Sequence, residues 1–399
     1  MKFYNPMQYI AIDIANQFGL DKVNYEERIQ WIKDNINDLE KLESQAEEPY
    51  LYHKAVRALR DSQAGKPTGH AVALDSASSG LQLMSVMMRD LDACIMTGLG
   101  NNRIDAYTII TDEMNRLMKE NGLEEVFVTR KQAKEAVMTA LYGSIAVPEK
   151  VFGEDLLPYF YQALKNKCDG AMTLLELLRG SWNSNIDVHS WYLPDGHYAY
   201  VPVMQTVQKR VEIKELSYTP VAQFNIQTPL DKGVSNIANV VHSIDAYLLR
   251  SLVRRCNYHK GIVSHFIDIS QDVKYKEVDT SLHGVERYIS TNMPDISVLE
   301  HISYKTIPHY PQALIEALRA ICETLLIHEP FEVICIHDSF ACSPVNCNYL
   351  RMHYNNILTE LSDSDVICDI LNQLYFTDDF INDEPKIGHI IKQGNYGIS

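Results

Sequence analysis

The stretch His70-Ala71-Val72-Ala73-Leu74-Asp75 is a short, mostly apolar segment that ends in an acidic residue and continues into the small-residue turn 76–80. A second apolar segment, 331–337, ends in the same way at Asp338. Apolar runs of this length predict β-strands, and the first is expected to be buried. Each aspartate would then lie at the rim of a sheet, held by rigid backbone but open to solvent. For either aspartate alone, capping the following turn or helix is the commoner role.

Two such carboxylates side by side would repel each other and require a cation. Mg²⁺ suits a site of this kind, because it binds one or two carboxylates together with substrate phosphates. Two metal ions about 3.5–4 Å apart activate the attacking hydroxyl and stabilise the leaving oxygen of a phosphoryl transfer. The sequence therefore predicts this chemistry if Asp75 and Asp338 meet in one sheet.

A second candidate element lies between Thr129 and Gly143, where the sequence predicts a helix. Arg130, Lys134, Met138 and Tyr142 recur at every fourth position, so they drift only slowly around one helix face. This stripe presents two cations, an apolar group and a phenol in line. The cations would neutralise a departing pyrophosphate, and the lysine would donate a proton to it. Taken alone, a solvated basic helix face is the commoner explanation.

The composition is that of an ordinary folded protein, with 46% hydrophobic and 22% charged residues. No apolar run approaches the roughly 20 residues needed to cross a bilayer. The eight cysteines lack the paired spacings of a zinc site, so we expect reduced, mostly buried thiols. The net charge of −16 argues against a nucleic-acid partner, because such binding depends on neutralising phosphates. Basic clusters that could offset it within a cleft are found at 130–134, 208–210 and 250–255.

Considered together, these segments resemble the single-subunit RNA polymerases of phages and mitochondria. Three stretches resemble the family's motifs A, B and C in the right order: 74–82 with 88–90, then Arg130-x-x-x-Lys134 with Tyr142-Gly143-Ser144, then His337-Asp338-Ser339-Phe340. Weaker similarities extend the resemblance over most of the chain, at 21–29, 191–196 and 241–243.

The resemblance implies an α+β right-hand polymerase fold, in which an antiparallel sheet forms the palm and helices form the fingers. The palm would comprise 1–101 and 243–399, and the fingers 102–242, with the thumb and the N-terminal domain missing. An extra stretch near 258–310 separates motifs B and C. We expect a surface insertion there, with a partner-docking element as the alternative.

The resemblance also assigns residues to roles. Asp75, the backbone of Ser76 and Asp338 would hold two Mg²⁺ ions, and His337 would lie at the primer end. Substrate binding and proton donation would fall to Arg130, Lys134, Tyr142, Gly143, His242, Gly80 and Tyr107. The alternatives are a buried, hydrogen-bonded histidine at 337 and simple core packing at 107. Motif A usually has glycine where this chain has Ser76.

Three positions indicate whether the resembling enzyme would synthesise RNA or DNA, because they differ between RNA polymerases and the related DNA polymerases. Gly80 stands where the DNA enzymes carry a glutamate that crowds the 2′ position of the sugar. Met138 replaces their phenylalanine, and Ser339 replaces the glutamate that follows the motif C aspartate. RNA is therefore the expected product. The alternatives are a template-directed DNA polymerase or primase-like enzyme, and a non-catalytic scaffold derived from a polymerase.

The implied partners are a DNA template, an RNA product and nucleoside triphosphates, with no membrane. No Asp-x-x-Gly-Arg motif, which holds the template–product hybrid in this family, is found in the chain. The chain is similar to the larger subunit of phage polymerases split between two genes, as in enquatrovirus-type podophages. We therefore expect a smaller, more basic subunit that carries the thumb and this motif and docks on helices around 29–42. A recruiting protein that binds single-stranded DNA and a location in the cytoplasm of an infected bacterium complete these expectations.

Overall fold

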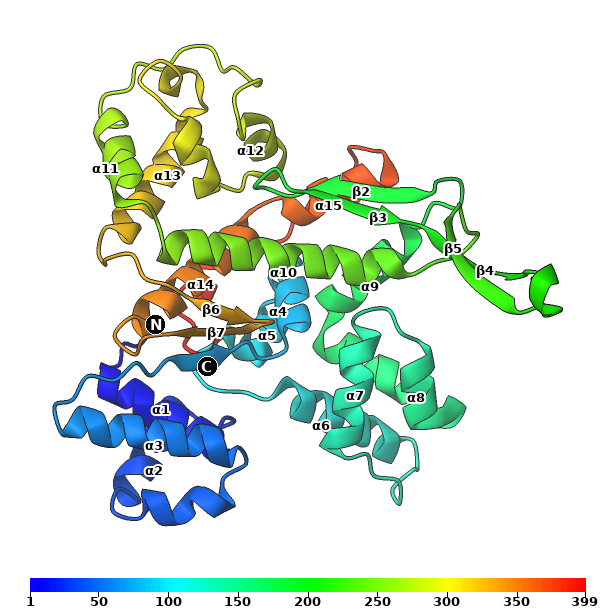
Figure 1. The fold of residues 1–399 in the computed structure, drawn as a ribbon, viewed down its shortest axis with the longest axis horizontal. Coiled ribbons are helices and arrows are strands. Elements are labelled where there is room, and N and C mark those ends of the chain that lie inside the picture. The colour runs from blue at the N-terminus through cyan, green and yellow to red at the C-terminus, as the bar shows by residue number, and fades with distance from the viewer.

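The structure is a computed structural model that describes residues 1–399. Helices surround a central three-stranded antiparallel sheet with the strand order β1-β7-β6, near which both termini lie (Figure 1). The strands are β1 (Val72–Asp75), β6 (Ile334–Ile336) and β7 (Ser339–Cys342). Both predicted strands are therefore confirmed, and they belong to one sheet although they lie far apart in the sequence.

The register of this sheet determines which residues meet. Asp75 pairs with Ser339 across β1 and β7, and Ile336 pairs with the same serine across β6 and β7. His337 and Asp338 form the tight turn between β6 and β7. The turn needs a left-handed backbone at His337, which has a φ of 55°. The end of β1 and the β6–β7 turn consequently lie side by side.

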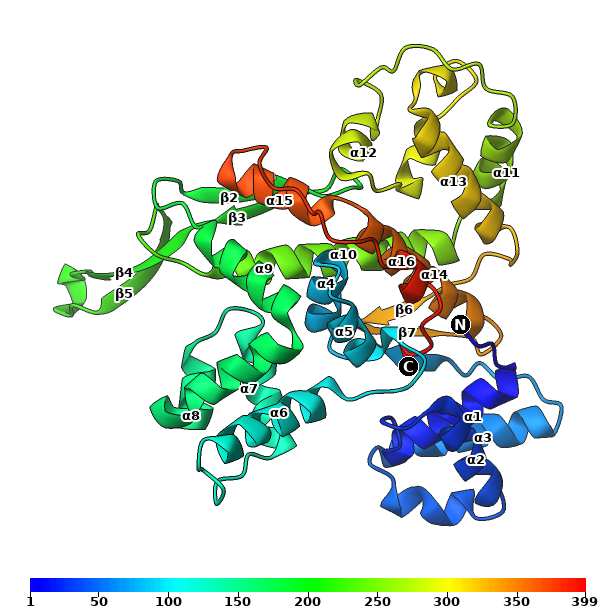
Figure 2. The same ribbon diagram turned by 180° about the vertical axis from the view of Figure 1, so that it is seen from behind.

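One face of the sheet is packed and the other is more open. Alternate residues point to opposite faces of a strand, and Val72 and Leu74 are buried together with Phe340 and Cys342. Figure 2 shows α4 (Ser79–Met87), α5 (Leu91–Cys94), α10 (Ser235–Cys256), α14 (Cys347–Asp363) and α16 (Gly388–Ile391) around the sheet. The short helix η2 (Ile95–Leu99) follows α5, and α15 (Val366–Tyr375) lies farther from the sheet, packed against the strand at 188–192. The outer edge of β1 is covered by the last residue, since Ser399 N donates to Asp75 O at 2.9 Å.

The N-terminal region forms a helical unit beside the sheet. It consists of α1 (Pro6–Phe18), α2 (Tyr25–Asp34), η1 (Leu39–Gln45) and α3 (Pro49–Gln63). A buried pair between His70 Nε2 and Asp13 Oδ2, 2.7 Å apart, connects α1 to the segment that leads into β1. The helices expected around 29–42 are α2 and η1, which a turn separates, because α2 ends at Asp34.

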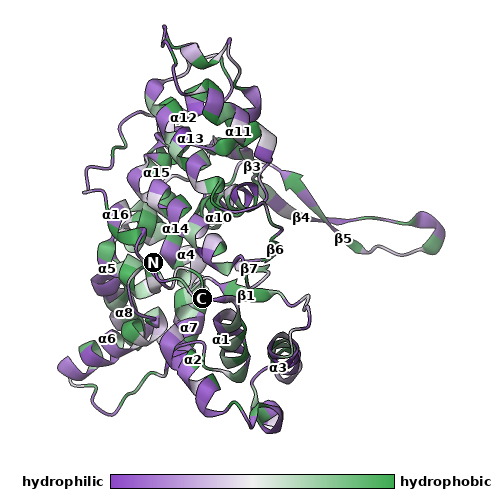
Figure 3. Cartoon of the chain, turned by 90° about the vertical axis from the view of Figure 1, so that its left-hand side faces the viewer, coloured by the Kyte–Doolittle hydropathy of each residue, from purple (hydrophilic) through white to green (hydrophobic).

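A second lobe lies on the other side of the sheet. Its helices are α6 (Ala106–Glu120), α7 (Arg130–Ala140), α8 (Ala146–Lys167) and α9 (Asp169–Gly180). Two hairpins follow, formed by β2 (Val188–Tyr192) with β3 (Tyr198–Pro202) and by β4 (Met204–Arg210) with β5 (Val221–Gln227), with η3 (Lys214–Leu216) in the loop of the second. Figure 3 shows the β4–β5 hairpin projecting far from the body.

The stretch expected to be a surface insertion forms a subdomain with its own hydrophobic core. Its elements are α11 (Lys260–Ile269), α12 (Val285–Thr291), η4 (Ile296–His301), η5 (Ile307–His309) and α13 (Gln312–Leu325). The buried residues of this core run from Tyr258 to Leu325, so the unit extends beyond the expected 258–310. None of the helices in the chain is both long enough and apolar enough to span a bilayer.

A single buried guanidinium connects the end of α4 to the C-terminal part of the chain. The Arg89 side chain donates to the carbonyl oxygens of Ser362 (2.9 Å), Ser364 (3.1 Å), Asn382 (2.8 Å) and Glu384 (2.7 Å). Ser362 is in the last turn of α14, Ser364 follows that helix, and Asn382 and Glu384 lie in the segment before α16. Arg89 therefore satisfies several backbone acceptors that no regular element satisfies.

Replacing this residue should destabilise the whole fold. We expect Arg89→Ala to lower the free energy of unfolding by about 3–5 kcal/mol, because a buried hydrogen-bonded charge is removed and its acceptors stay buried. Urea unfolding followed by circular dichroism measures the change. Arg57→Ala is the matched control, since Arg57 is exposed on α3, and it should change stability by less than about 0.5 kcal/mol. Equal effects of both substitutions would contradict this role for Arg89.

Candidate active site

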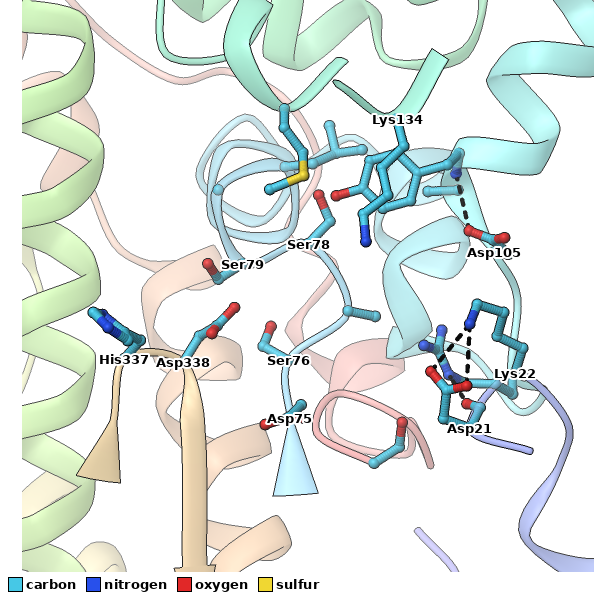
Figure 4. Close-up of a pocket in the computed structure, with 18 of the residues that line it drawn as sticks. Asp21, Lys22, Asp75, Ser76, Ser78, Ser79, Asp105, Lys134, His337 and Asp338 are labelled. Atoms are coloured by element: carbon cyan, nitrogen blue, oxygen red, sulfur yellow. Dashed lines mark hydrogen bonds and ion pairs between the residues drawn. The ribbon is translucent and has the colours of Figure 1, made fainter. Parts of the chain in front are cut away.

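A cleft of about 970 Å³ opens at the end of the sheet where β1 stops and β6 turns into β7. Its walls come from separate parts of the chain: the turn after β1, the start of α6, one face of α7, the middle of α10 and the β6–β7 turn. Figure 4 shows the acidic residues of the strand ends facing the lysine of α7 across this space. The cleft therefore joins the two candidate elements that the sequence indicated separately.

Asp75 and Asp338 both line the cleft. The backbone joins them directly, because Ser76 N donates to Asp338 O at 3.1 Å. Burial raises the pKa of Asp75 above its ordinary value, and the negative charge of Asp338 raises it further, while a hydrogen bond with Ser339 partly offsets both effects. This mutual repulsion is the electrostatic situation that a bound cation relieves.

The donor set fits Mg²⁺ better than a metal held in a closed protein cage. No group of three or more histidine, cysteine or acidic side chains is close enough to form such a cage. Mg²⁺ usually keeps several waters and binds through one or two carboxylates plus substrate phosphates. Asp75 and Asp338 are the two carboxylates that could bind such an ion here, and Ser76 lines the same cleft.

The α7 stripe faces this same cleft, as its spacing predicted. Arg130, Lys134, Met138 and Tyr142 all line it. Thr129 caps the start of the helix by accepting a hydrogen bond from Gln132 N, and the helix ends at Ala140, so the phenol lies in the turn that follows. The two cations of the stripe differ in their partners. Arg130 forms an ion pair with Asp105, whereas Lys134 pairs with no carboxylate.

Tyr107 packs against both cations of α7. The Arg130 guanidinium carbon and the Lys134 ammonium nitrogen each lie 5.7 Å from the centre of its ring. A cation within about 6 Å of an aromatic face is attracted to it. The tyrosine is only partly buried and lines the cleft. It therefore packs against the core on one side and is accessible from the cleft on the other.

A further part of the cleft wall is formed by Tyr142, His242 and Gly80. The rings of Tyr142 and His242 have their centroids 4.9 Å apart. A Cβ atom added at Gly80 would lie 2.7 Å from Tyr142 Oη, closer than real Cβ contacts. Glycine is therefore needed for the phenol to lie over the start of α4. The sequence had suggested these three residues one by one, and the structure shows that they are in contact.

Two other predicted residues occupy different positions. Gly143 does not line the cleft, and a Cβ there would lie 2.7 Å from Ile237 Cδ1 on α10. Its φ of 91° and this close approach indicate that Gly143 allows the chain to pack against α10 and does not itself contact a ligand in the cleft. His337 lines the cleft and is exposed at the turn. The alternative of a buried, hydrogen-bonded histidine is therefore wrong.

The cleft also contains charged residues to which sequence reasoning gave no role, among them Lys22, Asp105 and Asp245. Burial raises the pKa of Asp245 to about 6, and the charge of Asp338 adds to this effect. Asp245 lies three residues after His242, so helical spacing could have identified it. Lys22 lies 3.1 Å from Asp21, in a segment where the family resemblance was weak.

The other basic clusters do not reach the cleft. Arg250 and Arg254 pair with the buried Asp195, and Arg255 pairs with Glu360. The cluster at 208–210 lies on β4 of the projecting hairpin. Of the three clusters read from the sequence, the one at 130–134 contributes to the site.

Comparisons with known proteins agree with this geometry. A family model described as DNA-dependent RNA polymerase matches residues 4–151, a range that includes β1 and α7. The chain is 22% identical over 301 residues to the DNA-directed RNA polymerase of Pseudomonas phage phiKMV, which covers 60% of the chain and 37% of that relative. It is 23% identical over 202 residues to a probable DNA-directed RNA polymerase of Neurospora crassa, covering 46% of the chain and 20% of the relative.

The chain thus spans well under half the length of these relatives. The matched range nevertheless contains Asp75 of the cleft together with the whole α7 stripe. By the family model and by both relatives, the chain is similar to the DNA-dependent RNA polymerase family.

Proposed function

We propose that this chain is the catalytic part of a DNA-directed RNA polymerase. The observation that carries the proposal is the meeting of two opposite charge patterns in one cleft. The β1–β7 pairing brings Asp75 and Asp338 together, and α7 presents Arg130 and Lys134 to the same space. Carboxylates that hold metal ions and cations that hold a triphosphate are the two requirements of nucleotidyl transfer.

In the proposed reaction, the 3′-oxygen of the RNA attacks the α-phosphorus of a nucleoside triphosphate. The bond to the β-phosphate breaks and pyrophosphate leaves. Two Mg²⁺ ions bound by Asp75 and Asp338, with the Ser76 carbonyl, would activate the attacking oxygen and stabilise the leaving one. Lys134 is the proposed proton donor to pyrophosphate, because it lines the cleft without an ion-pair partner.

The sugar of the incoming nucleotide would lie against Tyr142, His242 and Gly80. The contact between the two rings supports a joint role, since a phenol and an imidazole together offer donors and acceptors to a ribose hydroxyl. A site built to hydrogen-bond a hydroxyl strongly rejects an analogue that lacks it. The small residue at position 80 favours RNA over the alternative of DNA synthesis.

The right-hand description follows as part of the proposal. The sheet and the helices behind it would form the palm, from 1–101 and 243–399, and the lobe at 102–242 would form the fingers. The cleft between them supports this division, because its walls come from both parts. His337, exposed beside Asp338, is the proposed contact with the primer end. The phage relative supports action on a DNA template in an infected bacterial cytoplasm.

We also propose a smaller, more basic partner subunit that carries the thumb and the Asp-x-x-Gly-Arg motif. The expected docking surface around 29–42 needs correction, because Ile29, Ile32 and Leu39 are buried within this chain. Exposed apolar side chains are found instead on β6, where Ile334 and Ile336 are 58% and 66% exposed. Such side chains beside a cleft support contact with another macromolecule. A recruiter that binds single-stranded DNA remains a further proposed partner.

The metal-binding assignment predicts that two isosteric substitutions abolish activity. Asp75→Asn and Asp338→Asn should each reduce nucleotide addition on the order of 10²-fold or more, as removal of one preorganised electrostatic group typically does. Primer extension in Mg²⁺ measures the rate, and thermal unfolding verifies folding. Asp112→Asn, on the exposed face of α6, is the control and should retain full activity. Near-normal extension by either cleft variant would refute the two-metal site.

The sugar-sensing assignment predicts a change in selectivity rather than in rate. Tyr142→Phe should reduce the preference for ribonucleotides about two- to twelvefold, because one hydrogen bond is worth about 0.5–1.5 kcal/mol. Competition between ribo- and deoxyribonucleoside triphosphates in single-nucleotide addition measures this ratio. An unchanged ratio would remove the phenol from the sensor.

A substitution at position 80 gives an independent test of the same assignment. Gly80→Ala should displace the Tyr142 hydroxyl and lower the selectivity to a similar degree, whereas in a Tyr142→Phe background it should add little. Gly80→Glu should suppress ribonucleotide use further, because its longer side chain reaches the 2′ position. Independent, additive effects at the two positions would contradict the contact between them.

The heteromer proposal is tested by co-expression with the neighbouring gene product. We expect the two chains to purify together and to extend a primed single-stranded template, while the chain alone adds few nucleotides. Gel filtration and the length of the extended products are the readouts. A chain that is monomeric and processive by itself would refute the need for a partner.

A further inference from the structure

Asp105 is held rigidly at the start of α6 by its own helix. Its Oδ1 accepts a hydrogen bond from Tyr107 N at 3.3 Å, which caps the helix, and its Oδ2 accepts one from Thr108 Oγ1 at 2.8 Å. The same Oδ2 accepts a third bond from Arg130 Nε, at the start of α7. A carboxylate fixed by two local bonds thus determines where the arginine side chain lies.

The contact with Asp105 uses only the inner nitrogen of the guanidinium. Arginine has five N–H donors in one plane, and Nε carries one of them. The two terminal nitrogens of Arg130 have no hydrogen-bond partner within the chain, and the side chain is 35% exposed. Four donors therefore remain for a ligand while the ion pair with Asp105 stays intact.

Electrostatics supports a stable pair. Burial by itself would raise the pKa of Asp105, but hydrogen bonds from Arg130 and Thr108 outweigh it and the pKa is lowered. The pair with Asp105 raises the pKa of Arg130. Both groups stay ionised across the neutral range, so the contact persists under the conditions in which a polymerase works.

Asp105 also fixes the ring on which the cations pack. Asp105 accepts a hydrogen bond from the backbone N–H of Tyr107. The centre of the Tyr107 ring lies 5.7 Å from both Arg130 Cζ and Lys134 Nζ. One carboxylate thus orients the guanidinium directly and the aromatic platform indirectly. The two α7 cations are arranged before any ligand arrives.

We propose that Asp105 is a positioning residue, which holds Arg130 so that its terminal nitrogens receive the outer phosphates of the incoming nucleoside triphosphate. This inference rests on the proposed function of the cleft. A long side chain loses conformational freedom when it binds a ligand, and fixing it beforehand removes that cost. The opposite possibility is that Asp105 competes with phosphate for the arginine, and it predicts an effect of opposite sign.

The test uses Asp105→Asn and Asp105→Ser, because serine retains the helix cap while lacking the carboxylate. The KM for nucleoside triphosphates should rise about three- to tenfold, the loss expected when one long side chain is no longer pre-ordered, while kcat changes less than twofold. In an Arg130→Gln background, the same substitutions should leave KM unchanged. Asp112→Asn, which changes an exposed carboxylate of the same helix, should have no effect on KM.

Equilibrium binding separates this inference from the proposed activity. A non-incorporated α,β-methylene nucleoside triphosphate should bind the Asp105 variants more weakly than the unaltered full-length chain, and a nucleoside monophosphate should bind both equally. This readout works even if no polymerisation is detected, whereas failure of the proposed function would appear as full activity of Asp75→Asn. An unchanged or lowered KM, or equal triphosphate binding, would overturn the role of Asp105.

Discussion

The antiparallel pairing of β1 with β7 is the constraint on which the rest of the site depends. It joins two segments more than 260 residues apart, and its register sets Asp75 opposite Ser339, next to Asp338. A shift of one residue would turn every side chain of β1 to the other face. Val72 and Leu74, which pack into the core from the buried face, oppose such a shift. Hydrophobic burial on one side of the strand therefore fixes the position of a carboxylate at its end.

The distribution of charge within the cleft explains how an acidic protein can accommodate a polyanionic substrate. With a net charge of −16, the chain as a whole repels phosphate. Several arginines are neutralised within the chain, as Arg255 is by Glu360 and Arg250 by Asp195. Lys134 is left without such a partner inside the cleft. Local geometry rather than overall charge thus governs what the cleft attracts, since screening weakens interactions beyond about 10 Å.

Much of this site could be predicted from the sequence where the signal is local. The strand ends at Asp75 and Asp338 could be predicted from short apolar runs. The cleft-facing stripe of α7 could be predicted because its residues recur at every fourth position. Contacts between distant segments carry no such signal. The ion pair between Asp105 and Arg130 and the proximity of Asp245 to Asp338 depend on tertiary packing, so spacing alone did not reveal them. The helices expected around 29–42 are present as α2 and η1, but the sequence did not show that Ile29, Ile32 and Leu39 are buried within the chain, because that also depends on tertiary packing.

The subdomain that contains α11, α12 and α13 branches from the main fold close to its most constrained point. It lies between α10, which carries His242, and β6, which leads to Asp338. Its two ends meet, because Phe331 N donates to Cys256 O at 2.9 Å and Tyr258 Oη donates to His328 O at 2.6 Å. A segment that leaves and returns at one place adds little closure entropy, which grows only slowly with loop length. Its separate hydrophobic core stabilises it independently of the sheet. The relative position of α10 and β6 is consequently set by the main core and those two closing hydrogen bonds, and not by the length of chain between them.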